Sequence, residues 1–332
     1  MCIRDRPTGI GKTEVAFLLA EIIKDAEIVS CDSMAVYKGM DIGTSKPDNS
    51  MREKIAHHMI DITESDRNFS AADYVENAKK AVKDITGRSK VPIIAGGSVM
   101  YLYSLLDGIF KGPGRNKKIR KELLSRAQGD DPLQVSSKPN RWGLKGSRVE
   151  GEFREKGQGA KELHQELTEM DPEAAVKIHP NDLRRIVRAL EVYYLTGSKI
   201  SSLRSQKAGI FGEYNTFIYG ISDNRTEIYR RIDNRADAMI KAGLVDEVRS
   251  IAGSISLSAY QGHGYKEIIE YLNGKYNLEE ALRLIKRNTR RFAKRQLSWL
   301  KRDKRVIWLE RSNFDSACSI AKFIADEFKK SL

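Results

Sequence analysis

The sequence predicts an α/β fold with a parallel sheet core and an inserted all-helical subdomain, and three observations support this prediction. A loop followed by an amphipathic helix and a short strand opens the chain. A second apolar strand, KVPIIA at 90–95, ends in Gly96-Gly97-Ser98 and precedes another helix. A long helical stretch rich in lysine and arginine then separates these elements from two later strands. Loop, helix and strand in this order are typical of a parallel sheet.

The individual elements follow from the spacing of apolar residues. Apolar residues at helical spacing predict a helix over 14–24, and the run AEIVS predicts a strand over 26–30 that leads directly to Asp32. Ser70 and Asp73 have the spacing of a capping box, which predicts that a helix begins there. Further strands are expected over 90–95, 216–221 and 305–309, and a further helix from about Tyr101.

The chain divides into a core in two parts and an insertion. Residues 1–111 form the first part of the core, 112–206 the helical insertion, and 207–332 the second part with a basic helix near its end. Residues 1–5 are too few and too charged for a central strand, so we expect the first strand of the sheet to be missing. The segment 129–159 has few aliphatic residues, many Gly and Ser and no periodicity, so we expect it to be disordered or poorly packed.

Composition limits the classes of function. The chain has 332 residues and a formal net charge of +13, which favours polyanionic partners. Cys2, Cys31 and Cys318 lie far apart without a CxxC pair, which argues against a disulfide framework or a zinc cluster. No apolar run reaches the roughly 18 residues that span a bilayer, and the start MCIRDR lacks the apolar core of a signal peptide. We therefore expect a cytoplasmic globular protein without membrane contact.

The stretch RPTGIGKTEVA at 6–16 nearly matches the pattern G-x-x-x-x-G-K-[ST] of a P-loop. Such a loop surrounds a diphosphate with main-chain amides, directs a lysine at the same anion and offers a hydroxyl to Mg²⁺. Gly11, Lys12 and Thr13 match its second half, and the helix that follows adds its dipole. Arg6 stands where the first glycine belongs, and a bulky residue there can distort the turn. The pattern predicts a P-loop-type core that binds a phosphorylated substrate.

A P-loop is most often found in a nucleotide kinase or NTPase, which is therefore the first alternative. Hydrolytic P-loop enzymes usually hold Mg²⁺ with an aspartate at the end of an apolar strand, but the strand at 91–95 is followed by no such residue. Asp32 stands instead at the end of the strand after the loop helix, at the edge of the sheet where ligands bind. We expect Asp32 to act on the substrate, and a turn or cap carboxylate is the structural alternative.

Seven longer motifs carry a resemblance to a known family. Together they closely resemble the bacterial tRNA dimethylallyltransferase family, from about Pro7 to the last strand apart from 129–159. The resemblance implies transfer of a dimethylallyl group from dimethylallyl diphosphate to N6 of the adenine just 3′ of the anticodon, in tRNAs that read codons beginning with U. It also implies that the insertion clamps the tRNA. The motifs are CDSMAVYKGMDIGTSKP (31–47), HHMID (57–61), GGSVMYL (96–102), DPEAAVKIHPNDLRRIVRALEVYYLTG (171–197), RRIDNRADAMIKAGLVDEV (230–248), GHGYKE (262–267) and RRFAKRQLSWLKRD (290–303).

The resemblance also implies roles for individual residues. The P-loop holds the diphosphate of the prenyl donor, not ATP, with Lys12 as the charge and Thr13 near Mg²⁺. Asp32 matches the base proposed to accept a proton from the adenine amine, which is a poor nucleophile without such help. Arg235 matches an arginine that stabilises the departing diphosphate, although by itself it indicates an exposed helix arginine paired with a nearby aspartate. The implied diphosphate-binding residues are Thr8, Gly9, Ile10, Gly11, Lys12 and Thr13.

Recognition of tRNA is expected at a further set of positions. The adenine must leave the stack of the anticodon loop to enter a closed pocket, so hydrogen-bonding and basic residues must compensate. Many family members have glutamine where Ala35 stands, whereas Ser98 keeps the hydroxyl of the usual threonine. We expect a monomer that binds the anticodon stem-loop. The implied contact residues are Ser33, Met34, Ala35, Ser98, Arg120, Arg184, Arg185, Arg188, Gln261, Gly262, His263, Gly264, Tyr265 and Lys266.

Two predicted helices carry basic faces independently of the resemblance. Over 183–195, Arg184 and Arg188 share a face that is free for phosphates, with a solvated basic face as the alternative. Over 283–305, dense basic residues with only Asp303 opposing them are typical of an RNA backbone track. The expected apolar stripes are Leu183, Ile186, Leu190 and Tyr193 in the first helix and Ile285, Phe292 and Leu300 in the second; the basic residues of the second are Arg287, Arg290, Arg291, Lys294, Arg295 and Lys301.

Two other possibilities follow from the sequence. His57 and His58 suggest metal ligands, but adjacent residues of a strand point to opposite faces, which favours a packing or turn role. A chain whose donor site is impaired by Arg6 and a missing first strand would keep only RNA binding.

Overall fold

The structure is a computed structural model that describes residues 2–5, 11–110, 112–128, 158–205 and 209–330. The chain forms two compact units, one of Met1–Gly108 with Gly209–Leu332 and one of Ile109–Ala208. The boundaries of the second unit lie close to those expected for the insertion at 112 and 206. No helix in the described part of the chain is long and apolar enough to cross a bilayer.

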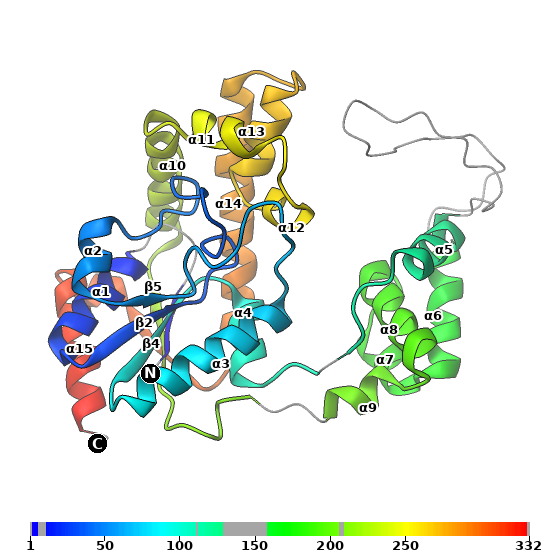
Figure 1. Ribbon diagram of the computed structural model, residues 1–332, viewed down its shortest axis with the longest axis horizontal. Coiled ribbons are helices and arrows are strands. Elements are labelled where there is room, and N and C mark those ends of the chain that lie inside the picture. Colours follow the sequence, from blue (N-terminus) through cyan, green and yellow to red (C-terminus); the bar gives the residue numbers. More distant parts are fainter. Residues whose placement is uncertain (1, 6–10, 111, 129–157, 206–208, 331–332) are drawn as a thin grey trace. The chain divides into compact units, whose positions relative to one another are not determined.

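The described residues of the first unit form a sheet of six parallel strands in the order β3-β2-β4-β1-β5-β6 (Figure 1). This confirms the predicted α/β fold with a parallel sheet. The predicted strand at 26–30 coincides with β2, and the other three are shifted by at most two residues at either end. The strands are β1 (Cys2–Asp5), β2 (Ala26–Ser30), β3 (His57–His58), β4 (Val91–Gly96), β5 (Ile218–Ser222) and β6 (Val306–Glu310).

The expectation that the first strand is missing is wrong. Cys2–Asp5 forms β1, which lies in the middle of the sheet and pairs in parallel with β4 on one side and β5 on the other. The short charged sequence forms a strand because both neighbours supply main-chain hydrogen bonds, which do not depend on side-chain type. A strand in the middle of the sheet therefore precedes the P-loop pattern in the chain, which is the order that a P-loop fold requires.

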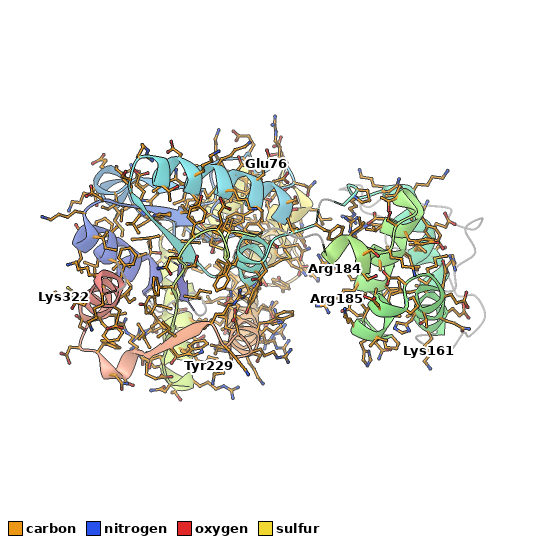
Figure 2. The ribbon with its side chains drawn as sticks, turned by 90° about the horizontal axis from the view of Figure 1, so that it is seen from below. Glu76, Lys161, Arg184, Arg185, Tyr229 and Lys322 are labelled. Carbon is orange, nitrogen blue, oxygen red and sulfur yellow. The ribbon has the colours of Figure 1, made fainter. Side chains whose placement is uncertain are left out.

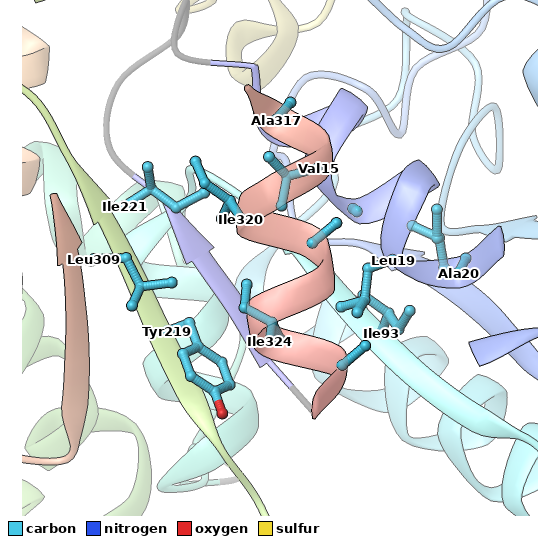
Figure 3. Close-up of a cluster of buried hydrophobic side chains, with 14 of the residues drawn as sticks. Val15, Leu19, Ala20, Ile93, Tyr219, Ile221, Leu309, Ala317, Ile320 and Ile324 are labelled. Carbon is cyan, nitrogen blue, oxygen red and sulfur yellow. The ribbon is translucent and has the colours of Figure 1, made fainter. Parts of the chain in front are cut away.

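The helices of this unit cover both faces of the sheet. On one face α1 and α15 pack together, and Val15, Leu19 and Ile320 meet side chains of β4, β5 and β6 in one buried cluster (Figure 3). On the other face α3 and α4 lie against the strands (Figure 1). The helix α3 begins with the predicted capping box of Ser70 and Asp73. The helices are α1 (Lys12–Ile23), α2 (Asn49–Lys54), α3 (Ala71–Gly87), α4 (Val99–Leu106), α10 (Arg225–Lys241), α11 (Leu244–Ile251), α12 (Leu257–Tyr260), α13 (Tyr265–Leu272), α14 (Leu278–Leu300) and α15 (Ala317–Lys329), with a 3-10 turn at Arg311–Asn313.

A second buried cluster joins α10, α11, α13 and α14 to the segment that follows β2. Tyr37 and Met40 are both fully buried and pack in this cluster with residues such as Leu244 and Ile268. The helices from α10 to α14 therefore form a support for the chain that leaves the carboxyl end of β2.

The second unit is entirely helical where it is described. Its core contains Leu123, Leu163, Ile186 and Leu190, which are all buried. The expectation of disorder at 129–159 falls almost wholly outside the described residues, apart from the last two, which begin α6. The helices are α5 (Lys117–Gln128), α6 (Gln158–Met170), α7 (Pro172–Lys177), α8 (Leu183–Thr196) and α9 (Ile200–Ser205).

Candidate active site

A cavity of about 650 Å³ lies beside the carboxyl ends of β2 and β4 and the N-terminus of α1. Gly11, Thr13, Asp32, Ala35 and Arg235 all line it, although they come from three separate parts of the chain. Ligands of parallel α/β sheets bind at this edge, where successive strands diverge. The other lining residues are Glu14, Ala16, Ile28, Ser30, Thr44, Ser45, Lys46, Pro47, Asp48, Met51, His57, Ile60, Ala95, Gly96, Arg231 and Asn234.

The second half of the P-loop pattern lies at the N-terminus of α1, beside the cavity. Gly11 is the N-cap of α1 and has a φ of 87°, a left-handed conformation that L residues rarely adopt. Thr13 lies in the first turn of the helix and lines the cavity, where the positive end of the helix dipole favours an anion. Arg6, Thr8, Gly9, Ile10 and the side chain of Lys12 lie outside the described residues.

Asp32 combines a turn role with a place in the cavity. Its Oδ1 accepts hydrogen bonds from the main-chain N–H groups of Met34 at 2.8 Å and Ala35 at 3.3 Å. The structural alternative of a turn carboxylate is therefore correct for one oxygen. Among the described residues no hydrogen bond to Oδ2 is found, and Asp32 lines the cavity.

Arg235 extends from α10 to the cavity and is not paired with an aspartate of its own helix. Its Nη2 donates to the carbonyl oxygen of Thr44 at 3.3 Å, and its buried Nε has no hydrogen-bond partner among the described residues. Burial lowers the pKa of Arg235 to about 10 and the negative charge of Asp32 opposes this shift, so the guanidinium is still a cation at neutral pH. An unsatisfied buried donor on a cavity wall is suited to an anionic ligand.

The loops after β2 and β4 are joined by hydrogen bonds next to residues that line the cavity. The N–H of Ser33 donates to Oγ of Ser98 at 2.8 Å, so this hydroxyl links the two loops. Gln296 of α14 donates through Nε2 to the carbonyl oxygen of Gly97, while its buried Oε1 has no partner among the described residues. A Cβ at Gly96 would lie 2.2 Å from the carbonyl oxygen of Cys31, so only glycine permits this approach.

The predicted contact segment 261–266 divides into exposed and buried residues. Gln261 and Lys266 are exposed, and His263 packs against Phe292 with ring centroids 4.6 Å apart. Burial is the main cause that lowers the pKa of His263, which keeps the imidazole neutral at pH 7. Tyr265 is buried and donates its hydroxyl to Glu247 at 2.6 Å, so its side chain belongs to the support of the site and is not free to contact tRNA.

In the second unit the structure corrects the prediction for α8. The fully buried Glu191 accepts hydrogen bonds from Arg120 at 2.8 and 2.9 Å and from Arg188 at 2.6 Å. Burial alone would raise the pKa of Glu191, but these bonds lower it to about 2. Arg120 and Arg188 are therefore engaged within the unit because a buried carboxylate needs charged partners. Arg184 and Arg185 project from α8 as exposed side chains, with Arg185 3.3 Å from Asp182 (Figure 2).

The predicted basic track on α14 is also only partly correct. Arg290 pairs with Asp233 of α10 at 2.6 Å, and Lys286 pairs with Asp237 at 2.6 Å, so Asp303 is not the only opposing acid. Phe292 is half-buried, whereas Ile285 and Leu300 are buried as expected. Tertiary packing of α10 against α14 creates these pairs, which no local pattern reveals. The exposed basic residues of the predicted track are Arg291, Lys294, Arg295 and Lys301.

The adjacent histidines have packing roles, as predicted. His58 bonds through Nε2 to the buried Glu27 at 2.7 Å, and His57 bonds through Nδ1 to the carbonyl oxygen of Ile55 at 2.7 Å. Among the described residues no cluster of three or more His, Cys, Asp or Glu side chains could hold a metal ion.

Several residues of the site carry no strong signal in the sequence alone. Lys46, Arg231 and Asn234 line the cavity, and Glu247 is bonded to the loop that forms one wall. Lys46 lies in a motif that carries the family resemblance, but only the fold shows which groups it contacts.

The fold and the cavity define a P-loop-type protein with a cavity at the carboxyl ends of its parallel strands, and the comparisons with known proteins refine this class. A model of the IPP transferase family matches residues 35–303. A tRNA dimethylallyltransferase of Alkaliphilus oremlandii is 40% identical over 97% of this chain and 95% of its own length. One of Thermotoga maritima is 42% identical over 91% of this chain and 89% of its own. The chain therefore belongs to the tRNA dimethylallyltransferase family, and it is a transferase.

Solved structures agree with this assignment. The tRNA isopentenylpyrophosphate transferase of Bacillus halodurans is 32% identical, with a TM-score of 0.66, over 99% of this chain and 96% of that one. A eukaryotic dimethylallyltransferase, captured in crystallographic snapshots acting on tRNA, is 25% identical with a TM-score of 0.74, over 100% of this chain and 79% of that one. A nucleotide kinase or NTPase is not favoured by any of these relatives.

Proposed function

We propose that this chain transfers the dimethylallyl group of dimethylallyl diphosphate to N6 of the adenine 3′-adjacent to the anticodon, in tRNAs that read U-initial codons. The observation that carries the proposal is that one cavity brings together the N-terminus of α1, Asp32 and Arg235. These groups supply an anion site, a proton acceptor and a cation, which are the three functions that prenyl transfer to an amine needs.

The donor diphosphate binds at the N-terminus of α1. Gly11 and Thr13 at this helix N-terminus line the cavity, and the unsatisfied Nε of Arg235 can donate to the same anion. As the C–O bond of the allylic donor breaks, charge accumulates on the diphosphate. A guanidinium fixed in a partly buried position stabilises that charge more in the transition state than in the substrate.

The residues present are compatible with Mg²⁺ at this anion. Thr13 offers a hydroxyl on the cavity wall, and Mg²⁺ commonly binds through one or two protein ligands together with phosphate oxygens and water. When bound, the ion would neutralise charge on the leaving diphosphate. Thr13 and the donor would hold it, since the described residues offer no cluster of acidic or histidine ligands.

Asp32 acts on the acceptor. Its Oδ1 is fixed by the amides of Met34 and Ala35, which orients the carboxylate, and Oδ2 remains free to accept a hydrogen bond from N6. The amine forms the C–N bond to the allylic carbon as the C–O bond breaks, and the N6 proton passes to Asp32. The Ser33–Ser98 hydrogen bond holds the loops that frame the base.

The remaining features fit a tRNA substrate. The formal net charge of +13 and the exposed basic residues of α14, together with Arg184 and Arg185, provide contacts for the phosphate backbone of an anticodon stem-loop. We infer that the protein acts as a monomer in the cytoplasm. The alternative of an RNA-binding remnant is not favoured by the relatives, and one of its two grounds is removed because the first strand is present.

A single assay tests the proposal. The protein is incubated with labelled dimethylallyl diphosphate, Mg²⁺ and an anticodon stem-loop, and the label is located in the RNA. We expect label on N6 of the adenine 3′ of the anticodon, and none on a stem-loop with guanine at this position. RNA binding without label would favour the remnant, and ATP turnover at ordinary kinase rates would favour the kinase.

A further inference from the structure

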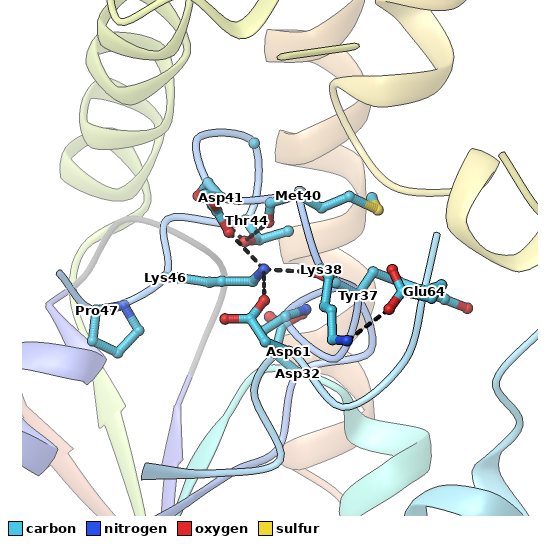
Figure 4. Close-up of polar contacts among 12 residues, drawn as sticks. Asp32, Tyr37, Lys38, Met40, Asp41, Thr44, Lys46, Pro47, Asp61 and Glu64 are labelled. Atoms are coloured by element: carbon cyan, nitrogen blue, oxygen red, sulfur yellow. Dashed lines mark hydrogen bonds and ion pairs between the residues drawn. The ribbon is translucent and has the colours of Figure 1, made fainter. Parts of the chain in front are cut away.

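The loop that forms one wall of the cavity, residues 40–47, is held by two charged side chains that the family resemblance does not explain. Lys46 lies within the loop, and Glu247 comes from α11. Figure 4 shows Lys46 at the centre of a set of polar contacts, and Lys46 and Asp32 both line the cavity. The carbonyl oxygen of Thr44, in the same loop, accepts the hydrogen bond from Nη2 of Arg235 at 3.3 Å.

Glu247 holds the first half of the loop. Its Oε2 accepts hydrogen bonds from the main-chain N–H groups of Asp41 at 2.9 Å and Ile42 at 2.6 Å, and its Oε1 accepts one from Gly43 at 3.1 Å. The hydroxyl of Tyr265 donates to Oε1 at 2.6 Å. Three successive amides around one carboxylate form a nest of the kind that binds free anions. Because Glu247 already fills this nest, the nest is not a second site for the substrate diphosphate.

Lys46 holds the second half. Only 2% of its side chain is exposed, and its Nζ donates to the carbonyl oxygen of Tyr37 at 2.6 Å, to Asp41 at 2.7 Å and to Asp61 at 2.5 Å. A lysine ammonium has three N–H donors, so all three are used within the protein. Lys46 lines the cavity of an anion-binding protein, yet its charge is not available to the anion.

The backbone supports the view that the loop is held in place. Ser45 precedes Lys46 in the chain, and Asp61 is one of its hydrogen-bond partners. They have φ values of 50° and 55°, which residues other than glycine rarely adopt. Such conformations persist where surrounding contacts determine them, and they are frequent next to functional sites. Arg52 adds a further bond to Asp61 at 2.8 Å.

We propose that Glu247 and Lys46 are positioning residues for prenyl transfer: they fix the 40–47 loop so that the Thr44 carbonyl holds Arg235 against the donor diphosphate. This inference rests on the proposed function. Neither residue contacts the reacting atoms. Their loss lets the loop relax and displaces the guanidinium of Arg235 in the transition state, while ground-state binding of the donor at α1 is retained.

The experiment uses the full chain and compares Lys46→Met and Glu247→Gln with matched controls. Lys38→Met and Glu64→Gln remove the partners of an exposed ion pair, 2.6 Å apart, in the same region. We expect kcat to fall by about tenfold or more in Lys46→Met and Glu247→Gln, with KM for dimethylallyl diphosphate changed by less than about threefold. Amides 41–43 should exchange hydrogen faster in Glu247→Gln, and neither control should change kcat or exchange.

Two outcomes would overturn the inference. A raised KM for the donor with unchanged kcat in Lys46→Met would make Lys46 a diphosphate ligand, and faster exchange at 41–43 without a loss of kcat would show that loop position does not matter. If Glu247→Gln does not fold, Tyr265→Phe removes one donor to the same carboxylate and should change exchange and kcat in the same direction. Wild-type protein whose amides at 41–43 are protected but which transfers no dimethylallyl group would contradict the proposed function. The conclusion that Glu247 holds the 40–47 loop would not be affected.

Discussion

At the scale of single residues, Asp32 shows how one side chain serves both structure and chemistry. Its Oδ1 closes the turn after β2 through the amides of Met34 and Ala35, and Oδ2 lies available beside the cavity. A carboxylate divided in this way is held in one orientation before the substrate arrives, so no reorganisation is needed when the proton moves.

This division of roles makes a specific prediction for two substitutions. Asp32→Asn keeps an oxygen that can accept both amide hydrogen bonds but removes the base, whereas Asp32→Ala removes both. We expect each variant to lose roughly two orders of magnitude or more in the transfer rate, the scale of general-base loss, while the affinity for tRNA is kept. Single-turnover rates and RNA binding measured in parallel check this. Activity in Asp32→Asn with loss in Asp32→Ala would assign Asp32 a structural role alone.

At the scale of elements, α14 separates its basic residues into two kinds. Arg290 and Lys286 are paired with aspartates of α10 and join the two helices, and Arg283 is paired with Glu280 of its own helix. Arg291, Lys294 and Arg295 are exposed. Only the exposed and unpaired charges can release counterions when RNA binds.

The two kinds of basic residue should respond differently to salt. Arg291→Gln and Lys294→Gln should each weaken tRNA binding and reduce the slope of log K against log salt by about 0.7 to 0.9. Arg283→Gln, the matched control on the same helix, should leave the slope unchanged because Arg283 is already paired with Glu280. Binding titrations at several salt concentrations measure the slopes. Equal slopes for all three variants would contradict an RNA track on this face.

At the scale of the whole molecule, the chain consists of two units with separate cores. The unit with the cavity is organised by its parallel sheet, and the inserted unit by helix packing around the Glu191 cluster. Each unit therefore has its own determinants of stability, and a lesion in the insertion need not disturb the donor site.

The Glu191 cluster gives the insertion a definite response to acid. The lowered pKa of Glu191, about 2, means that its contribution is complete above the usual value of 4.5 and is lost as pH falls towards 2. Glu191→Gln should destabilise the inserted unit by about 3 kcal/mol at pH 7, because it leaves two arginines without their carboxylate. The difference in stability between Glu191→Gln and wild type should shrink below pH 4.5. Hydrogen exchange of the amides in α5 and α8 measures this difference.

The control for this prediction is Glu173→Gln, which removes an exposed carboxylate from α7 of the same unit. This change should alter stability by less than about 0.5 kcal/mol. Binding of dimethylallyl diphosphate should be unchanged in both variants. A pH-independent difference between Glu191→Gln and wild type would show that the carboxylate charge is not the source of the stability.

Much of this protein was determined by local sequence. Short apolar runs located the strands that became β2 and β4, the P-loop pattern located the start of α1, and Ser70 with Asp73 located the start of α3. The motifs of the family located Asp32 and Arg235, which the structure brings to one cavity. These features are local because helix starts, strands and turns depend on residues that are close in the chain.

Only the tertiary structure decided the rest, because the remaining contacts join residues far apart in the chain. Cys2–Asp5 is a strand because β4 and β5 flank it, and α15, which no sequence pattern was used to predict, completes one face of the sheet. Arg188, which was expected to be free for phosphates, is hydrogen-bonded to the buried Glu191. Lys46, a cation on the cavity wall, donates to three acceptors within the protein. Burial decides such pairings, since a charge removed from water must find a partner, and sequence shows the charge but not the burial.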